Sequence, residues 1–286
     1  MSPTGKVVLI TGCAKGGIGY EYCKAFSRLG CHVIGTDIAN RLPELSDLES
    51  DRIRVLPLDV SSDDSVMSAV TKIIAEFDNI DVLINNAGVS CTGPMAELPL
   101  ETVRRTWEVN CLGQLRLIQA VVPHMIRSKS GCIANVGSMV GQVPTPWAGT
   151  YCASKAWDHA MSDVLRMELK PFGVHVTKVM PGMVRSNFGR ADSDRLGSKE
   201  WGIYKGFNEV IKERARASQS GRAAEAAEVA RVVARRVLSP QPPREIIVGG
   251  FTGFLSLLAW GAVGSGYCSS LFISLQIKLP RLVVPC

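Results

Sequence analysis

The sequence has few aromatic side chains, few charges and no paired cysteine motif. Aromatic residues make up 6% of the chain and charged residues 20%, and the formal net charge is +6. Its nine cysteines occur singly, without a CxxC pair, which favours reduced thiols in the cytoplasm, and we expect no metal site. The aromatic residues are too dispersed for a basic stripe with stacking rings, so we expect no nucleic-acid partner. Residues 6–10 read as a strand rather than as part of a signal peptide.

What the chain does contain is a regular alternation of strands and helices. Its 286 residues, 46% of them hydrophobic, suit one large α/β domain. Short β-branched runs separated by helical-length segments predict a doubly wound parallel sheet with helices on both faces. The seven predicted strands are 7–10, 32–37, 53–58, 82–85, 132–136, 174–179 and 245–248. The predicted helices are 19–29, 63–77, 102–125, 151–170 and 223–238, and Ser61 or Ser62 would cap the second.

Two segments fall outside this alternation. Residues 187–222 have no clear period and are rich in charge, glycine and serine, so we expect a mobile loop or a lid there. Residues 246–277 contain no charged side chain over 32 positions. We therefore expect a single domain at 1–250 and an apolar extension at 251–286.

A glycine-rich run, TGCAKGGIG at 11–19, joins the first predicted strand to the first helix. Glycines there allow a tight turn and let a pyrophosphate reach the amide groups at the helix N-terminus. A purely structural turn is the alternative. The position between strand and helix favours a dinucleotide site, with cofactor contacts from Gly12, Gly17, Ile18 and Gly19.

Two residues near this run favour different cofactors. Asp37 ends the second predicted strand, where a carboxylate can bind the adenosine ribose hydroxyls and repel a 2′-phosphate. Lys15 lies within the run, and its ammonium could hold that phosphate. Asp37 stands where the ribose must come, whereas Lys15 reads equally as a solvated side chain. NAD(H) is therefore favoured, and NADP(H) stays open.

Ser138, Tyr151 and Lys155 form the candidate catalytic group. Tyr151 and Lys155 are four residues apart, so on a helix they share one face. Free tyrosine, with a pKa near ~10, is a poor base at neutral pH, but a neighbouring ammonium and a positive nicotinamide would favour the phenolate. Ser138 could hydrogen-bond the reacting oxygen. The spacing by itself also fits an ordinary amphipathic helix pair.

Taken in order, these motifs resemble the short-chain dehydrogenase/reductase family, which has a Rossmann-type fold. The match runs from about residue 6 to residue 250 and comprises the glycine loop, Asp59, NNAG at 85–88, Asn110, Ser138, YxxxK at 151–155 and Pro181-Gly182. The resemblance implies reversible hydride transfer between a nicotinamide and a carbonyl or secondary-alcohol carbon. Tyr151 would then exchange the hydroxyl proton.

The resemblance also implies roles that the residues alone do not show. Asn110 would hold a water that links Lys155 to solvent, although a satisfied core amide is the commoner reading of such a residue. Tyr151 and Lys155 would contact the cofactor as well as the substrate. Further cofactor contacts would come from Asp59, Asn86, Val184 and Ser186. From spacing alone, Asp59 and Asn86 read equally as turn residues. Family members usually form homo-oligomers.

The glycine loop departs from the usual TGxxxGxG pattern, because its GIG triplet begins one residue later, at Gly17. This variant resembles a fungal and yeast branch of acyl-dihydroxyacetone-phosphate reductases and secondary-metabolite reductases. Members of that branch generally prefer NADPH and carry a basic residue near the end of the second strand. Asp37 departs from that pattern as well, so the cofactor remains NAD(P)(H), with NAD(H) favoured by the residue itself.

The apolar tail and one short segment bear on the substrate. The tail is longer than the ~20 residues that span a bilayer. It could be a membrane anchor through 251–277 on the cytosolic face of the endoplasmic reticulum or a lipid droplet, a lid or dimer contact, or a divergent end. Pro144-Thr145-Pro146-Trp147 lies between Ser138 and Tyr151, where it would form either a substrate wall or a proline-rich turn. A lipid-like or polycyclic ketone in lipid or secondary-metabolite biosynthesis fits best; a catalytically silent NAD(P)-binding sensor or scaffold is the alternative.

Overall fold

A seven-stranded parallel sheet forms the centre of the computed structural model, which describes residues 5–197, 199–219 and 221–253. The strand order is β3-β2-β1-β4-β5-β6-β9, and every neighbouring pair is parallel. The strands are β1 Val7–Thr11, β2 His32–Asp37, β3 Ile53–Pro57, β4 Val82–Asn85, β5 Gly131–Val136, β6 Val174–Pro181 and β9 Glu245–Val248. The doubly wound fold and all seven predicted strands are confirmed, with ends that differ by two residues at most.

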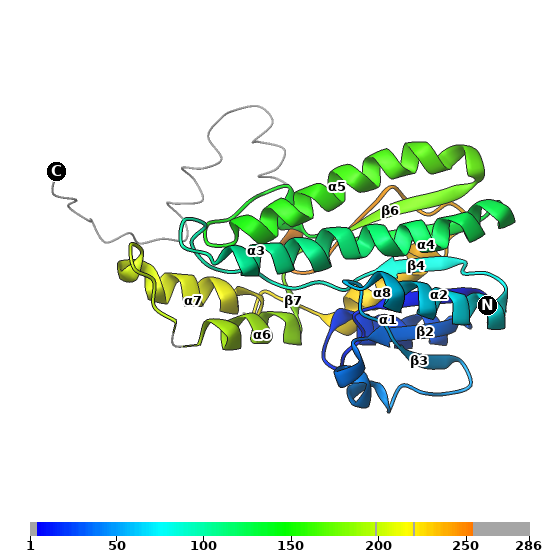
Figure 1. The fold of residues 1–286 in the computed structure, drawn as a ribbon, viewed down its shortest axis with the longest axis horizontal. Helices are drawn as coiled ribbons and strands as arrows, with labels where there is room; N and C mark the ends of the chain where they lie inside the picture. The colour runs from blue at the N-terminus through cyan, green and yellow to red at the C-terminus, as the bar shows by residue number, and fades with distance from the viewer. Residues whose placement is uncertain (1–4, 198, 220, 254–286) are drawn as a thin grey trace.

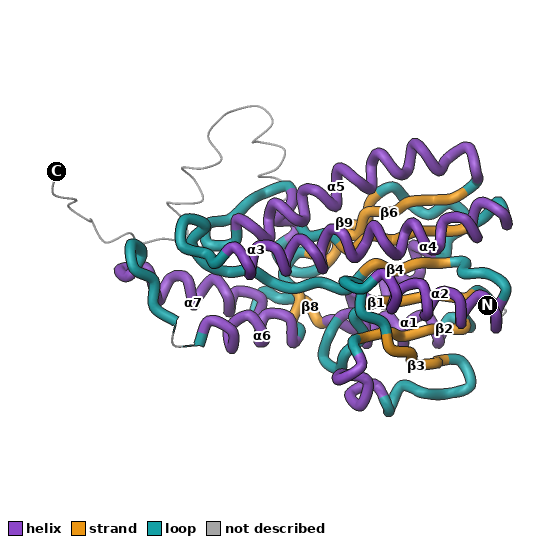
Figure 2. The backbone as a smooth tube through the Cα atoms, in the orientation of Figure 1, coloured by secondary structure: helices purple, strands orange, loops and turns teal. Residues whose placement is uncertain are grey.

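Helices cover both faces of the sheet (Figure 1, Figure 2). Helices α1 (Ile18–Arg28) and α8 (Ala226–Val237) pack together on one face. Helices α2 (Asp63–Phe77), α4 (Gly113–Ser128) and α5 (Gly149–Leu169) pack on the other. Alternate residues of each strand serve the two faces: Val8 of β1 lies in the first core and Leu9 in the second.

The predicted helix 102–125 is three consecutive helical segments. Helix α3 (Leu100–Trp107) passes into a π-helix at Glu108–Leu112, and α4 follows directly. A π-turn inserts an extra residue per turn and is frequent at functional sites. Here it contains Asn110, one of the predicted site residues.

Residues 187–222 are more regular than expected. They contain α6 (Asn187–Leu196) and α7 (Asn208–Arg216), two helices that the sequence patterns did not indicate. The role of this segment, a mobile loop or a lid, stays a prediction. Both helices are short and carry few apolar residues, which is why no period was visible. Their buried side chains, including Leu196 and Ile211, form a separate core with Cys91 and Leu98. We call residues 187–219 of this segment, without the undescribed position 198, the substrate lid, after one of the two roles predicted for it from the sequence.

Short elements complete the description. They are the 3₁₀ helices Ala39–Leu45, Met139–Gly141, Lys170–Phe172, Lys205–Phe207 and Ala217–Gln219, and the two-residue strands β7 Val184–Arg185 and β8 Ala224–Glu225. The cap of α2 is Ser62, whose hydroxyl accepts a hydrogen bond from the Ser65 amide at 3.2 Å.

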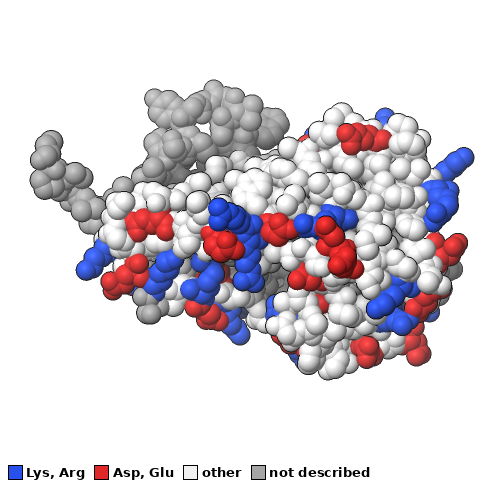
Figure 3. Space-filling view, in the orientation of Figure 1, with Lys and Arg blue, Asp and Glu red and all other residues white. Residues whose placement is uncertain are grey.

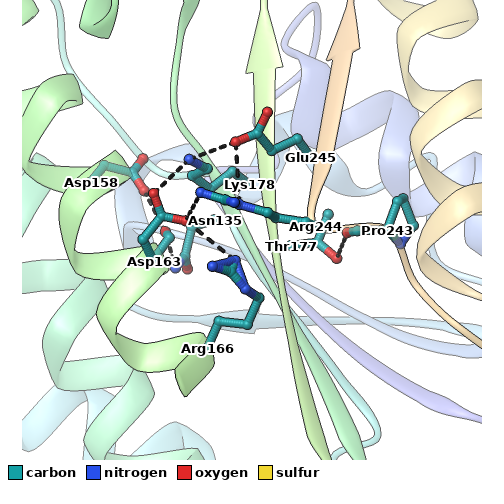
Figure 4. Close-up of polar contacts among 10 residues, drawn as sticks. Asn135, Asp158, Asp163, Arg166, Thr177, Lys178, Pro243, Arg244 and Glu245 are labelled. Atoms are coloured by element: carbon teal, nitrogen blue, oxygen red, sulfur yellow. Dashed lines mark hydrogen bonds and ion pairs between the residues drawn. The ribbon is translucent and has the colours of Figure 1, made fainter. Parts of the chain in front are cut away.

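An ion-pair cluster joins the edge strand β9 to β6 and α5 (Figure 4). The Lys178 ammonium lies 2.9 Å from an Asp163 oxygen and 2.8 Å from a Glu245 oxygen. Arg244 lies 3.2 Å from the same Asp163 carboxylate. Its member on α5, Asp163, lies in the second half of that helix, after the predicted catalytic residues Tyr151 and Lys155.

The apolar extension predicted at 251–286 lies outside the described residues, apart from 251–253. Within the described ranges, no helix has both the length and the apolar character needed to cross a membrane.

Candidate active site

The predicted site residues gather where the central strands end. Strands β1, β4 and β5 end at Thr11, Asn85 and Val136, and parallel strands bring these ends to one edge of the sheet. Thr11 connects two of these strand ends. Its hydroxyl accepts hydrogen bonds from the Asn86 and Ala87 amides at 3.1 and 3.0 Å.

The glycine-rich run is packed too closely for other residues. Gly12 has φ +71°, and a Cβ atom there would lie 2.8 Å from the Ala87 Cα. A Cβ on Gly19 would lie 2.2 Å from the Gly12 carbonyl oxygen. Gly17 caps α1 without a side-chain hydrogen bond, so the first amides of the helix are left for a ligand. This arrangement fits the pyrophosphate of a dinucleotide.

Asn86 holds the NNAG turn against this loop. Its side-chain amide donates to the carbonyl oxygens of Thr11 and Gly12 at 2.9 and 3.0 Å. The side chain therefore shapes the wall of the cofactor site. Direct contact between Asn86 and a cofactor stays a prediction.

At the adenosine end, Asp37 is buried and Lys15 is paired. The Asp37 carboxylate accepts hydrogen bonds from the Ala14 amide at 2.8 Å and the Ile38 amide at 2.9 Å. The Lys15 ammonium lies 2.6 Å from Asp47, and its hydrogen bond is the main cause that lowers the pKa of that carboxyl. The positive charge of Lys15 is thus already balanced by an acidic neighbour.

Ser138, Tyr151 and Lys155 come together as predicted from their spacing. Ser138 precedes the short helix Met139–Gly141, while the other two lie on α5. The Ser138 side chain lies close enough to Tyr151 to lower the pKa of its hydroxyl. The Lys155 ammonium donates to the Val136 carbonyl at 2.7 Å and lies 5.8 Å from the centre of the Tyr151 ring. Their catalytic roles remain predictions.

The electrostatic surroundings decide the resting protonation of this group. Burial is the largest influence on the pKa of Tyr151 and raises it, while the charge of Arg214 and the nearby Ser138 side chain lower it. Burial lowers the pKa of Lys155, and the charge of Asp158 opposes that change. The pKa of Tyr151 is therefore raised overall, not lowered, and Lys155 is not among the main influences on it, so the expected stabilisation of the phenolate by Lys155 stays a prediction. A phenol that is protonated at neutral pH can act as an acid.

Asn110 is a fully buried amide whose hydrogen bonds all go to the protein. Its oxygen accepts from the Val89 amide at 2.8 Å, and its nitrogen donates to the Val89 carbonyl and to the Ser154 hydroxyl. The side chain thus joins the segment after β4 to α5. A water link to Lys155 would need another acceptor in this π-helix, such as a backbone carbonyl.

The remaining predicted cofactor residues lie around the rim of the site. The Asp59 carboxylate accepts from the Ser61 amide at 2.9 Å, which is the Asx turn that its spacing also allowed. Val184 is buried in β7, and the Ser186 carbonyl accepts from the Gln219 side chain at 2.9 Å. Their contacts with a cofactor stay predictions.

Asn187 is a residue of the site that the sequence patterns missed. Its amide donates to the Gly16 carbonyl and its side chain to the Lys15 carbonyl, each at 2.8 Å. These bonds tie the first residue of α6, and hence the substrate lid, to the glycine loop. The one available signal was an asparagine soon after Pro181-Gly182, and no spacing rule selects it.

Aromatic rings from the lid pack beside the catalytic group. The Trp147 ring lies 5.5 Å from the rings of both Tyr204 and Phe207, measured between centroids. Phe188 lies 5.7 Å from the ring of Tyr151. The segment 144–147 therefore contacts the lid through its tryptophan, which fits both a substrate wall and a proline-rich turn with one packed aromatic ring.

Comparison with known proteins agrees with this geometry. A family model described as short chain dehydrogenase matches residues 6–196. The NADPH-dependent 1-acyldihydroxyacetone phosphate reductase of Schizosaccharomyces pombe is 38% identical over 73% of this chain and 71% of its own. The short-chain dehydrogenase virD of Hypocrea virens is 32% identical over 90% of this chain and 89% of its own. A solved short-chain dehydrogenase from Streptomyces avermitilis is 28% identical, with a TM-score of 0.79, and covers 96% of this chain and 100% of its own.

Proposed function

The chain belongs to the short-chain dehydrogenase family, and from this premise we propose that it interconverts a carbonyl and a secondary alcohol on an apolar, lipid-like or polycyclic substrate. Enzymes of this family are oxidoreductases that use NAD(P) on CH–OH and C=O groups. The aromatic rings of Trp147, Tyr204 and Phe207 support the apolar character of the substrate. One relative is named for an acyl lipid substrate, which supports the same class.

The observation that carries the proposal is the meeting of three side chains: the buried Lys155 ammonium lies 5.8 Å from the centre of the Tyr151 ring, and Ser138 lies close enough to act on the pKa of the Tyr151 hydroxyl. In the reductive direction, the Tyr151 phenol gives its proton to the carbonyl oxygen, which Ser138 orients by a hydrogen bond. The Lys155 ammonium stabilises the phenolate that remains. In the oxidative direction, the phenolate takes the hydroxyl proton back. A bound nicotinamide supplies or accepts the hydride in this chemistry.

Tyr151→Phe tests this assignment. We expect turnover to fall by about 10²–10⁴-fold, because the substitution removes only the acid/base group. Cofactor binding, measured by calorimetry, should be retained. Tyr22→Phe is the matched control, since it also removes a buried hydroxyl, one with no hydrogen-bond partner in the described core. A Tyr151→Phe enzyme with more than about a tenth of wild-type activity would refute the role.

A panel of apolar ketones, assayed with NADH and NADPH in parallel, tests the substrate class. Turnover of long-chain or polycyclic ketones well above that of short ones is the expected result. Cofactor binding without turnover of any ketone would instead favour a silent sensor or scaffold.

We further propose NAD(H) as the preferred cofactor. The support is the buried Asp37 carboxylate and the pairing of Lys15 with Asp47, which leave no free cation of the glycine loop for a 2′-phosphate. The NADPH-dependent relative argues the other way. Asp37→Ala should shift the NADPH/NADH ratio of kcat/KM toward NADPH by on the order of 10-fold or more. An unchanged ratio would remove Asp37 as the determinant.

We also propose that the tail associates with a membrane. Its support is the uncharged sequence at 246–277 rather than basic surface, because Figure 3 shows both signs of charge interspersed on the visible face of the substrate lid. Fractionation of the full chain tests this. We expect recovery with membranes, and release to the supernatant for Leu257→Asp/Leu258→Asp. Full recovery of the wild type in a low-salt supernatant would contradict the proposal.

Homo-oligomerisation is the last part of the proposal. Two exposed apolar residues one turn apart on α5, Val164 and Met167, support it. Light scattering should give a multiple of the chain mass, and Val164→Asp/Met167→Asp should give the monomer. A monomeric wild type would exclude an oligomer at that concentration.

A further inference from the structure

Arg214 reaches from the substrate lid toward the catalytic tyrosine. Its Nε and one terminal nitrogen donate to the Thr145 hydroxyl at 3.1 and 3.0 Å. Thr145 belongs to the segment between Ser138 and Tyr151. On α7, Ile211 and Ala215 are buried in the lid core. Arg214 comes three residues after Ile211 and so lies on the same face of the helix. Arg214 is therefore directed inward rather than to solvent.

The charge of Arg214 has no carboxylate partner in the described part of the chain. Two other cations of the lid have such partners: Arg195 lies 2.9 Å from Asp192, and Lys212 lies 2.8 Å from Glu209. The lid cations Arg190, Lys205 and Arg216 have none either among the described residues, but they are exposed to solvent, whereas Arg214 is half-buried. Two nitrogens of Arg214 donate hydrogen bonds to the neutral Thr145 hydroxyl, so the other N–H groups of the guanidinium can still donate to a ligand. Its charge is felt at Tyr151, where it lowers the pKa that burial raises. Trp147 and Tyr151 pack against the same core as Ile211 and Ala215, so α7 lies beside the candidate catalytic tyrosine.

Trp147 provides a second donor without an acceptor. Its indole Nε1 is buried and has no hydrogen-bond partner among the described residues. Its φ of +63° lies in the left-handed region, which is strained for a side chain of this size. The backbone is held there by a hydrogen bond from the Gly93 amide to the Trp147 carbonyl at 2.7 Å. Strain and a buried unpaired donor together are typical of a position kept for a ligand.

We propose that Arg214, assisted by the indole N–H of Trp147, binds an anionic group of the substrate close to the carbonyl that Tyr151 protonates. This inference rests on the proposed function and narrows its substrate to an amphiphile. The group is a carboxylate or a phosphate, the two anions whose geometry a guanidinium matches with paired hydrogen bonds. The apolar remainder lies against the rings of Trp147, Tyr204 and Phe207.

Kinetics with matched ketones test the proposal. The probes are a medium-chain β-keto acid with its methyl ester, and a medium-chain α-hydroxyketone phosphate with its unphosphorylated form. Wild-type kcat/KM should favour the ionised member of at least one pair by about 10- to 100-fold, and that pair identifies the anion. Arg214→Leu should remove this preference and leave the neutral ketones within about threefold of wild type. Trp147→Phe also changes the apolar wall, so it should affect both members of a pair, but it should cost the ionised member several-fold more than the neutral one.

Two control variants separate charge from structure. Arg214→Lys keeps a cation and should retain part of the preference. Arg216→Leu changes an exposed arginine on the same helix and should leave the preference intact. A wild type without any preference, or an Arg214→Leu enzyme that loses neutral and ionised substrates equally, would overturn the proposal.

The proposed function can fail separately. If the wild type reduces none of the four ketones, calorimetry with the ionised and neutral probes still decides. Binding of an ionised probe that Arg214→Leu weakens by at least tenfold would uphold the anion site, and binding that is equal in both proteins would overturn it.

Discussion

Two buried lysines of this protein differ in what surrounds them. Lys155 is 4% exposed and Lys178 is 5% exposed. Lys178 lies within 3 Å of two carboxylates, whereas the Lys155 ammonium donates to the Val136 carbonyl and has no carboxylate at ion-pair distance in the described chain. A buried charge is costly unless it is paired. The ion pairs of the fold therefore account for Lys178, whereas an unpaired buried lysine at position 155 is what the proposed function requires.

One helix serves both lysines. The first half of α5 carries Tyr151 and Lys155, and the second half carries Asp163, which pairs with Lys178 (Figure 4). Burial lowers the pKa of Lys155. Around Asp163, burial would raise the carboxyl pKa, but Lys178 and the nearby arginines lower it overall. We infer that the ion pair between Asp163 and Lys178 anchors the second half of α5. This anchor helps the first half to hold Tyr151 and Lys155, which have no carboxylate partner among the described residues, in a fixed position.

The largest expected effect comes from Lys155→Met. Turnover should fall by at least about 100-fold, because the phenolate of Tyr151 loses its stabilising charge. The melting temperature should stay within about 2 °C of wild type, since a buried unpaired charge is replaced by an apolar chain of similar length. Steady-state assays and thermal unfolding measure the two quantities. A large loss of stability with little loss of activity would show that Lys155, like Lys178, serves the fold and not catalysis.

The pH dependence of the two reaction directions is the next largest effect. The raised pKa of Tyr151 means that the phenol, which reduction needs, is fully present at neutral pH and is lost only as pH rises through that pKa. Oxidation needs the phenolate, so its rate should rise about tenfold per pH unit below the pKa. We expect a flat profile for carbonyl reduction from about pH 6 to 8, with cofactor and substrate saturating. Oxidation that is equally flat over this range would contradict the assignment.

Features of the structure that depend on residues close together in the sequence were predicted, and features that depend on contacts between distant residues were not. Strands were predictable because continuous apolar runs between turn residues are a local signal. Tyr151 and Lys155 were predictable for the same reason, since four residues of helix fix their geometry. The two helices of the substrate lid were not, because they are short and polar and are stabilised by packing against Leu98 and Cys91, about a hundred residues earlier.

Contacts distant in sequence explain the other omissions. Asn187 meets the glycine loop across 172 positions, and Arg214 meets Thr145 across 69. No local pattern identifies either pair. Asn110 was predicted as a site residue only through the order of the family motifs. The structure shows a buried amide whose hydrogen bonds are made within the protein, which was the interpretation without the family resemblance.

Lys178→Met should affect stability rather than catalysis. Removing the cation leaves Asp163 and Glu245 without their shared partner, at a cost of about 2 kcal/mol because both carboxylates are partly solvated. The melting temperature should fall by roughly 4–8 °C, with kcat unchanged. The lowered pKa of Asp163 stabilises the fold above the ordinary aspartate pKa, about 3.9, and this contribution is lost as pH falls through the lowered value. Acid unfolding of the variant should therefore depend less on pH, and an identical acid transition would count against the cluster.

The smallest expected effect concerns Asp158, a fully buried carboxylate one turn after Lys155 that distinguishes the surroundings of Lys155 from those of Lys178. It accepts a hydrogen bond from the Ser162 hydroxyl at 3.2 Å, and its charge raises the pKa of Lys155 against the effect of burial. Asp158→Asn keeps the shape and removes the charge, so Lys155 should lose its proton at lower pH. The alkaline limb of kcat/KM for reduction should move to lower pH, with a several-fold loss at neutral pH. Asp163→Asn, on the same helix, should leave that limb in place and lower the melting temperature instead. If both variants left the limb unchanged, Asp158 would not be the counter-ion, and Val136 would be the only described group that holds the Lys155 ammonium.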